Sequence, residues 1–298
     1  MTTTTITTGQ RTFSRQTVDD LTVLVDTPDA PPRATILMVP PFGISADNLF
    51  LPAYIMVANG FRVIRFDPRN HVGDSPGEIW GFLLSAFAAD ARRMIEWSTP
   101  DIVLGFSLAA PPILRALGEA GSPAHAVLAA PVVSVRYTLN EVLGIDYYAP
   151  ENADMPQAIL VLGEKIDGRL FRADTLDFHL HSHEETIADA LRAAGTVSMI
   201  AGSEDPWVSL GEVRELARRR DEELGGDRTR LRTVSVGTHQ FNLNPAVANT
   251  YMAAVLGECL QLAGAGEDEG RMPPLHEAIS DRQGILEQLG SAKPRRGK

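Results

Sequence analysis

The chain lacks the features of disulfide-bonded, secreted and membrane-spanning proteins. It has 298 residues and a single cysteine, Cys259, so no intrachain disulfide can form. The first residues, MTTTTITTGQRTF, have neither the basic segment nor the apolar segment of a secretory signal. No window approaches the roughly 18 uninterrupted apolar residues that a membrane-spanning helix needs. We therefore expect a cytoplasmic protein without a membrane span.

The chain has fewer basic than acidic residues. The 27 lysines and arginines stand against 38 aspartates and glutamates, which gives a formal net charge of −11. A nucleic-acid-binding protein needs a basic face, so this balance argues against a nucleic-acid partner. It does not argue against an acidic carrier protein, because local patches decide that interaction. The chain is long enough to bury a full core.

Strand-like and helix-like segments alternate along most of the chain. The strand candidates are 35–41, 61–68, 101–107, 125–134, 196–204 and 230–237. They are almost continuously apolar, which is typical of a parallel sheet covered by helices on both faces. Helical patterns lie at 48–60, 81–98, 108–121 and 244–264. We predict an α/β fold with a mostly parallel sheet.

Three regions depart from this alternation. RTFSRQTV and LTVLVDTP alternate apolar with polar residues and predict an antiparallel hairpin at the sheet edge. Residues 135–190 interrupt the core and predict an inserted lid over the carboxyl ends of the strands. The core is then 1–134 with 191–264, and 265–298 is expected to be a C-terminal helix followed by a basic tail.

A serine follows the strand candidate in DIVLGFSLAAPPI (101–113). Where a strand turns sharply into a helix, only small residues fit two positions before and after the corner. Gly105 and Ala109 hold those positions around Ser107. The stretch matches a nucleophile elbow, which lifts the serine hydroxyl clear of the sheet at a helix N-terminus. The alternative is a serine that only caps the following helix.

Two further residues complete the order serine, acid, histidine that hydrolases with this elbow use. Asp205 lies in a turn after one strand candidate (AGSEDPWV), and His239 lies in the loop after the last (VSVGTHQF). We predict that Ser107 is the nucleophile, His239 the base and Asp205 the acid that orients it. Glu204 competes for the acid role, but Pro206 favours its neighbour Asp205 by fixing a turn there.

Acyl transfer also requires two N–H donors for the oxyanion. The first is expected to be the backbone amide of Leu108, directly after the serine. The second is expected from the loop VPPFGIS. Because Pro40 and Pro41 have no N–H, Phe42 is the first available donor and Gly43 the next.

Four longer stretches carry a resemblance to a known family: RVIRFDPRNHVGDSPG, VVSVRYTLNEVLGIDYYAPENADMP, EDPWVSLGEV and GTHQFNLNP. The sequence resembles the acyl-transferase subunit of the bacterial bioluminescence fatty-acid reductase system, a myristoyl-acyl-carrier-protein thioesterase. The resemblance spans most of the chain, including the lid. It implies an α/β-hydrolase fold and places the family's catalytic serine, aspartate and histidine on Ser107, Asp205 and His239. It does not imply light emission.

Two features depart from that family. The elbow is Gly-Phe-Ser-Leu-Ala, where the family has an alanine-led version, and Pro111 and Pro112 follow it. If a helix began at Leu108, the prolines would remove N–H donors to the carbonyls of Ser107 and Leu108. We therefore expect a distorted first turn, and the family's chain-length preference does not carry over.

The predicted function is serine-dependent hydrolysis or transfer of an acyl group from a thioester or ester, through an acyl-Ser107 intermediate. An acyl-carrier protein is a candidate partner, and no cofactor is expected. The lid residues proposed to line an acyl pocket are Leu139, Val142, Leu143, Ile145, Tyr147 and Tyr148. The alternatives are a small-ester esterase, or a biosynthetic enzyme of the same fold that catalyses elimination or cyclisation on a polyketide-like metabolite.

One motif is left without a function. His179, His181 and His183 alternate in FHLHSHEE and would share one face of a strand, whereas on a helix they would diverge. We expect no metal site there.

Overall fold

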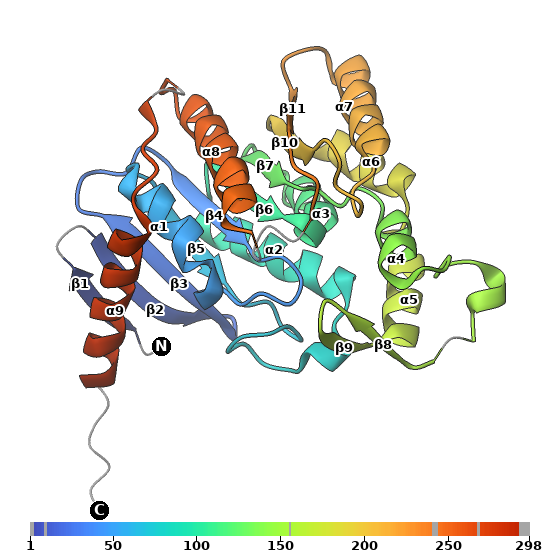
Figure 1. Cartoon of the computed structure of the whole chain (residues 1–298), viewed down its shortest axis with the longest axis horizontal. Coiled ribbons are helices and arrows are strands. Elements are labelled where there is room, and N and C mark those ends of the chain that lie inside the picture. The colour runs from blue at the N-terminus through green and yellow to red at the C-terminus, as the bar shows by residue number, and fades with distance from the viewer. Residues whose placement is uncertain (1–2, 9–10, 155, 240–243, 267–268, 292–298) are drawn as a thin grey trace, which may run out of the picture.

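The fold is built on one large twisted sheet (Figure 1). In the computed structural model, the described residues are all except 1–2, 9–10, 155, 240–243, 267–268 and 292–298. Within them the sheet has nine strands in the order β1-β2-β3-β5-β4-β6-β7-β10-β11. The strands are β1 Thr4–Thr8, β2 Arg11–Val18, β3 Leu21–Pro28, β4 Thr35–Val39, β5 Arg62–Phe66, β6 Ile102–Phe106, β7 His125–Ala129, β10 Val197–Gly202 and β11 Thr229–Val234.

Strands β5 to β11 of this order run parallel, and β2 and β3 form the antiparallel hairpin predicted from the alternating segments. Strand β1, which was not predicted, extends this edge by pairing antiparallel with β2. The central parallel strands β4, β6 and β7 are buried along almost their whole length because both faces are covered, whereas the edge strand β11 is mostly polar and partly exposed. Leu37 and Val39 of β4 pack into one core, whereas Ile36 and Met38 pack into the other. The predicted α/β-hydrolase fold, with a mostly parallel sheet between helices, is confirmed.

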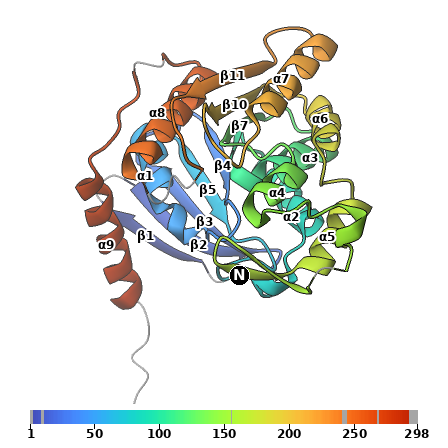
Figure 2. The same ribbon diagram turned by 45° about the vertical axis from the view of Figure 1, so that its right-hand side comes forward.

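Helices α1 and α8 cover one face of the sheet, and α2, α3 and α7 cover the other (Figure 2). The helices of the chain are α1 Phe50–Ala58, α2 Leu84–Ser98, α3 Ala110–Ala120, α4 Val135–Leu143, α5 Gly168–Asp177, α6 His183–Arg192, α7 Leu210–Leu224, α8 Pro245–Leu262 and α9 Leu275–Ser291. None of the described helices is long and apolar enough to cross a membrane.

The segment between β7 and β10 holds α4, a hairpin of β8 (Ala158–Val161) and β9 (Glu164–Asp167), α5 and α6. A two-residue turn closes the hairpin, and both of its residues, Leu162 and Gly163, have positive φ. Helix α6 packs against α3 and α7 of the core. The part of the predicted lid that extends away from the core is therefore α4, the hairpin and α5 (Figure 1).

The C-terminal helix α9 packs along β1 at the far edge of the sheet (Figure 1). Ile285 of α9 packs with Ile6 and Phe13 of the hairpin. Asp281 of α9 accepts hydrogen bonds from Thr8 Oγ1 and Arg11 Nε, each at 2.9 Å. These contacts join the two ends of the chain. The predicted basic tail lies largely in 292–298, outside the described residues.

Candidate active site

Ser107 occupies a strained corner between β6 and a short 3₁₀ turn, Ser107–Ala109, that leads into α3. Its φ is +53°, a left-handed conformation that costs a non-glycine residue about 1–2 kcal/mol. A Cβ on Gly105 would lie 2.1 Å from Ile113 Cδ1 and 3.2 Å from Ala109 Cβ, so glycine lets α3 pack closely against the corner. The Val132 amide donates to the Ser107 carbonyl at 3.1 Å and holds the turn from outside. Local packing thus keeps the serine in the conformation of a nucleophile elbow.

The proline pair is accommodated without loss of hydrogen bonds. The first turn after Ser107 is a 3₁₀ turn, in which the Ala110 amide donates to the Ser107 carbonyl. Helix α3 then begins at Ala110 and carries the prolines at its first positions. An amide at those positions has no partner within the helix, so proline costs nothing there. The expected distortion is therefore the 3₁₀ turn itself.

A chain of hydrogen bonds joins three side chains that lie far apart in the sequence. Ser107 Oγ is 2.6 Å from His239 Nε2, and His239 Nδ1 is 2.8 Å from Asp205 Oδ2. The carboxylate can only accept, so Nδ1 carries the proton and Nε2, hydrogen-bonded to Ser107 Oγ, can accept the serine proton. Asp205 and His239 are 6% and 5% exposed, and burial strengthens this interaction by excluding water.

The loop after β10 carries both acid candidates, Glu204 and Asp205, but directs only one of them toward His239. Asp205 Oδ1 accepts the Trp207 amide at 3.0 Å, which orients the carboxylate toward His239. The Trp207 ring lies 5.1 Å from the imidazole, centroid to centroid. Glu204 is exposed, and its backbone amide donates to the Val236 carbonyl. The geometry thus brings Asp205, rather than Glu204, to the histidine.

Both residues expected to supply oxyanion donors lie beside the serine, because β4 and β6 are neighbouring parallel strands. Leu108 and Phe42 line the same pocket as Ser107. Neither backbone amide donates to a protein acceptor within the described part of the chain. The Gly43 amide is already used, because it donates to His71 Nε2 at 3.1 Å. Of the two amides considered in this loop, Phe42 is the one left to donate.

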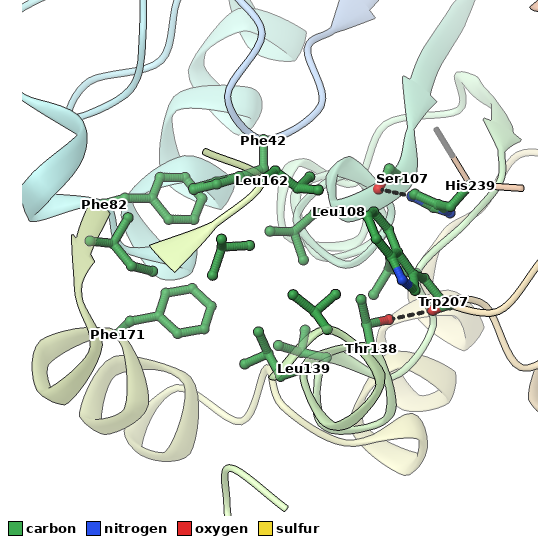
Figure 3. Close-up of a pocket in the computed structure, with 15 residues that line it drawn as sticks. Phe42, Phe82, Ser107, Leu108, Thr138, Leu139, Leu162, Phe171, Trp207 and His239 are labelled. Carbon is green, nitrogen blue, oxygen red and sulfur yellow. Dashed lines mark hydrogen bonds between the residues drawn. The ribbon is translucent and has the colours of Figure 1, made fainter. Parts of the chain in front are cut away.

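An apolar pocket, partly open to solvent, extends from Ser107 toward α4 and α5 (Figure 3). Ser107 and His239 lie at one end, and Phe82 and Phe171 lie at the other (Figure 3). The remaining lining residues are Phe42, Leu108, Val132, Val135, Thr138, Leu139, Val142, Val161, Leu162, Ile166 and Trp207. Thr138 Oγ1 donates to the Trp207 carbonyl at 2.7 Å and ties the lid helix α4 to the loop that carries Asp205.

Of the six lid residues expected in the pocket, the structure places Leu139 and Val142 in its lining, and Ile145 is exposed. Leu143 packs beside the core, and Tyr147 and Tyr148 are buried inside the lid. The Tyr147 hydroxyl donates to the Gly168 carbonyl, and burial raises its pKa to about 12. The two tyrosines turn inward because their hydroxyls find partners in α5 rather than in an apolar pocket.

Sequence reasoning missed the aromatic residues of the pocket. Phe82 precedes α2 and Phe171 lies in α5, and no motif links them to the serine. Of these three, only Trp207 could have been found from the sequence, because it follows Asp205 by two residues.

The three histidines at 179–183 do not converge: His179 and His181 contact Glu185, while His183 Nε2 lies 2.8 Å from the Glu212 carbonyl. The described residues contain no group of three or more potential metal ligands.

Comparison with known sequences identifies the family. The profile of the family described as "Acyl transferase" matches residues 28–257. An acyl transferase of Photorhabdus laumondii is 27% identical over 228 residues, which cover 75% of this chain and 73% of that protein. An acyl transferase of Photobacterium leiognathi is 27% identical over 225 residues, which cover 74% and 72%. The resemblance drawn from the sequence is confirmed.

Solved structures share the fold at low identity. The ferulic acid complex of Est1E from Butyrivibrio proteoclasticus has a TM-score of 0.64 at 15% identity, covering 88% of this chain and 99% of that chain. The esterase Pf2001 of Pyrococcus furiosus has a TM-score of 0.55 at 17% identity, covering 84% and 90%. A thioesterase domain from the curacin biosynthetic pathway has a TM-score of 0.51 at 12% identity, covering 83% and 99%.

Proposed function

Because the chain belongs to the acyl transferase family, we propose that it is a serine hydrolase or acyltransferase that forms an acyl ester on Ser107. The observation that carries the proposal is the hydrogen-bonded chain from Ser107 through His239 to Asp205 at the end of an apolar pocket. The strained serine and the two unused amides beside it support the same chemistry.

In the proposed reaction, His239 Nε2 takes the proton of Ser107 Oγ as that oxygen attacks the carbonyl carbon of the acyl donor. The Leu108 and Phe42 amides donate to the oxyanion of the tetrahedral intermediate. When the intermediate collapses, the imidazolium gives its proton to the leaving thiol or alcohol. Asp205 holds the proton on Nδ1 and stabilises the imidazolium. Water or another acceptor then repeats these steps on the acyl-Ser107 ester and releases the acyl group.

The proposed substrate is a thioester or ester whose acyl chain is apolar. Apart from Ser107, Thr138 and His239, every pocket residue has an apolar or aromatic side chain. An alkyl chain buried there gains about 0.8 kcal/mol per methylene, so the pocket favours longer chains until they reach its closed end. The donor's alcohol or thiol portion lies outside the pocket, where a coenzyme or an acyl-carrier protein has room.

Intact-protein mass spectrometry tests the proposal. The chain is mixed briefly with acyl-CoA, acyl-carrier-protein and p-nitrophenyl ester donors of graded length. We expect an increment of one acyl group that is absent from Ser107→Ala and present in Ser122→Ala, since Ser122 follows the far end of α3. Ser107→Ala should lose turnover and keep its melting temperature. An absence of both acyl-enzyme and released acid with every donor would refute the proposal and favour elimination or cyclisation.

A further inference from the structure

The loop that carries Phe42 is fixed to a second loop, residues 67–78, at two backbone amides. The Ala46 amide donates to Asp67 Oδ1 at 2.6 Å, and the Gly43 amide donates to His71 Nε2 at 3.1 Å. The second loop is rigid at the point of attachment. Asp67 Oδ2 accepts the Asp74 amide at 2.9 Å, and a Cβ on Gly73 would lie 2.2 Å from the Asp67 carboxyl carbon. The 67–78 loop therefore acts as a support for the loop at the active site.

His71 is buried, with an exposure of 4%, and its ring contacts three phenylalanine rings: Phe42, Phe82 and Phe87. Because the Gly43 amide is a donor, His71 Nε2 must be unprotonated. The ring proton is then on Nδ1, which faces the Val72 carbonyl at 3.3 Å. Burial lowers the pKa of His71 to about 4, so the ring is neutral at physiological pH.

The hydrogen bond to His71 fixes the central peptide of a tight turn. The Ile44 amide donates to the Pro41 carbonyl at 3.2 Å, and Gly43 has φ +74°. A turn of four residues with positive φ only at its third position is a type II turn. Its central peptide, between Phe42 and Gly43, can flip to the type I arrangement at little cost because glycine tolerates either sign of φ. His71 accepts the N–H of that same peptide and so holds it in one orientation.

We propose that His71 is a positioning residue whose Nε2 holds the Gly43 amide and thereby keeps the adjacent Phe42 N–H directed at the oxyanion on Ser107. The inference rests on the proposed acyl-serine chemistry. His71 does not line the pocket, so it acts through the turn and not by touching the acyl group. Without this hydrogen bond the turn would keep only the Ala46 attachment to the 67–78 loop, and the Phe42 N–H, one residue before the released amide, would no longer be held at the oxyanion.

Two substitutions separate this role from simple packing. The amide of His71→Gln reaches the position of Nε2 and keeps an acceptor for Gly43, whereas His71→Leu has similar bulk and no acceptor. We expect His71→Leu to lower kcat by about 10²-fold, near the cost of losing one oxyanion donor, with KM little changed. His71→Gln should recover most of that loss. Phe61→Leu, in the core on the opposite face of the sheet, is the control for lost stability alone.

A second readout uses an alkyl trifluoromethyl ketone, which forms a tetrahedral adduct with a reactive serine. In His71→Leu its affinity should fall by the same factor as kcat/KM, because the adduct needs the oxyanion donors. The corresponding alkyl methyl carbinol, which forms no oxyanion, should bind equally well to both proteins. If His71→Leu does not fold, His71→Asn replaces it, because its shorter amide does not reach Gly43.

Three results would overturn the inference. His71→Leu could keep the wild-type kcat, or His71→Gln and His71→Leu could lose kcat equally. The ¹⁵N spectrum of the wild-type protein could instead show the proton of His71 on Nε2. The failure of the proposed function is distinct, because then the wild-type chain itself forms no acyl-Ser107.

Discussion

If the pocket holds the acyl chain as proposed, the end opposite Ser107 sets the maximum chain length. Phe82 and Phe171 are 1% and 2% exposed, and their rings stack with centroids 5.9 Å apart and planes 16° apart. They lie opposite Ser107 across the pocket (Figure 3). An acyl chain that enters from the serine must stop at these rings. Phe171→Ala removes one ring and extends the pocket into α5.

The size of the effect follows from the space released. Loss of a buried ring opens a void on the order of 100 Å³, which can hold apolar groups. If about three or four more methylenes enter it, each contributes about 0.8 kcal/mol. At about 1.4 kcal/mol per factor of ten, kcat/KM for the longer donors rises about 10²-fold. The same void lowers the free energy of unfolding by about 3–5 kcal/mol.

The assay is kcat/KM for p-nitrophenyl esters of graded chain length, measured for wild type, Phe171→Ala and the milder Phe171→Leu. Phe61→Ala, in the core of the opposite face, controls for lost stability and should keep the wild-type length profile. An unchanged length optimum in both Phe171 variants, with both proteins folded, would refute the placement of the acyl chain.

Three further predictions test the acid, the support loop and a buried carboxylate in β3. Asp205→Asn should lower kcat by about 10⁴-fold because it leaves the wrong imidazole tautomer, whereas Glu204→Gln should have little effect; equal losses in the two variants would contradict the assignment. The unfolded chain protonates its histidine near pH 6.5 and the folded chain only near pH 4. Lowering the pH between these values should therefore destabilise the fold by up to about 3 kcal/mol through His71. Urea unfolding at graded pH measures this loss, and His71→Gln should show a smaller one. If the free energy of unfolding falls with pH equally in both proteins, another group than His71 causes the loss. Asp26 is fully buried between Arg11 and Arg65, so Asp26→Asn should lower the free energy of unfolding by about 3–5 kcal/mol in denaturant melts. The exposed pair of Arg218 with Glu222 is the control, and a loss in Glu222→Gln as large as that in Asp26→Asn would contradict the reasoning.

Much of the core could be predicted from local patterns. Strands such as β4 and β6 are apolar at every position that a covered parallel sheet buries, and each ends near its predicted residue. The three residues of the hydrogen-bonded chain were also accessible from the sequence. Each follows a strand, and Gly105 and Ala109 mark the corner at which Ser107 stands.

Local patterns failed where partners come from different segments. Tyr147 and Leu139 are both lid residues with large side chains, yet only Leu139 faces the pocket. The Tyr147 hydroxyl turns toward Gly168, a partner 21 residues away that no periodicity indicates. The ion pair of Arg11 with Asp281 likewise joins residues from opposite ends of the chain.

The sequence by itself determined the succession of strands and helices along the chain and the serine, acid and histidine that follow three of the strands. Those features depend on side-chain size, hydrophobicity and chain direction within a few residues. Only the tertiary structure decided which acid meets His239, where the apolar pocket ends and which of the Phe42 and Gly43 amides is held by His71. Each of these depends on a distance between segments, such as that from Gly43 to His71, and a contact between segments is fixed by the packing of the whole sheet.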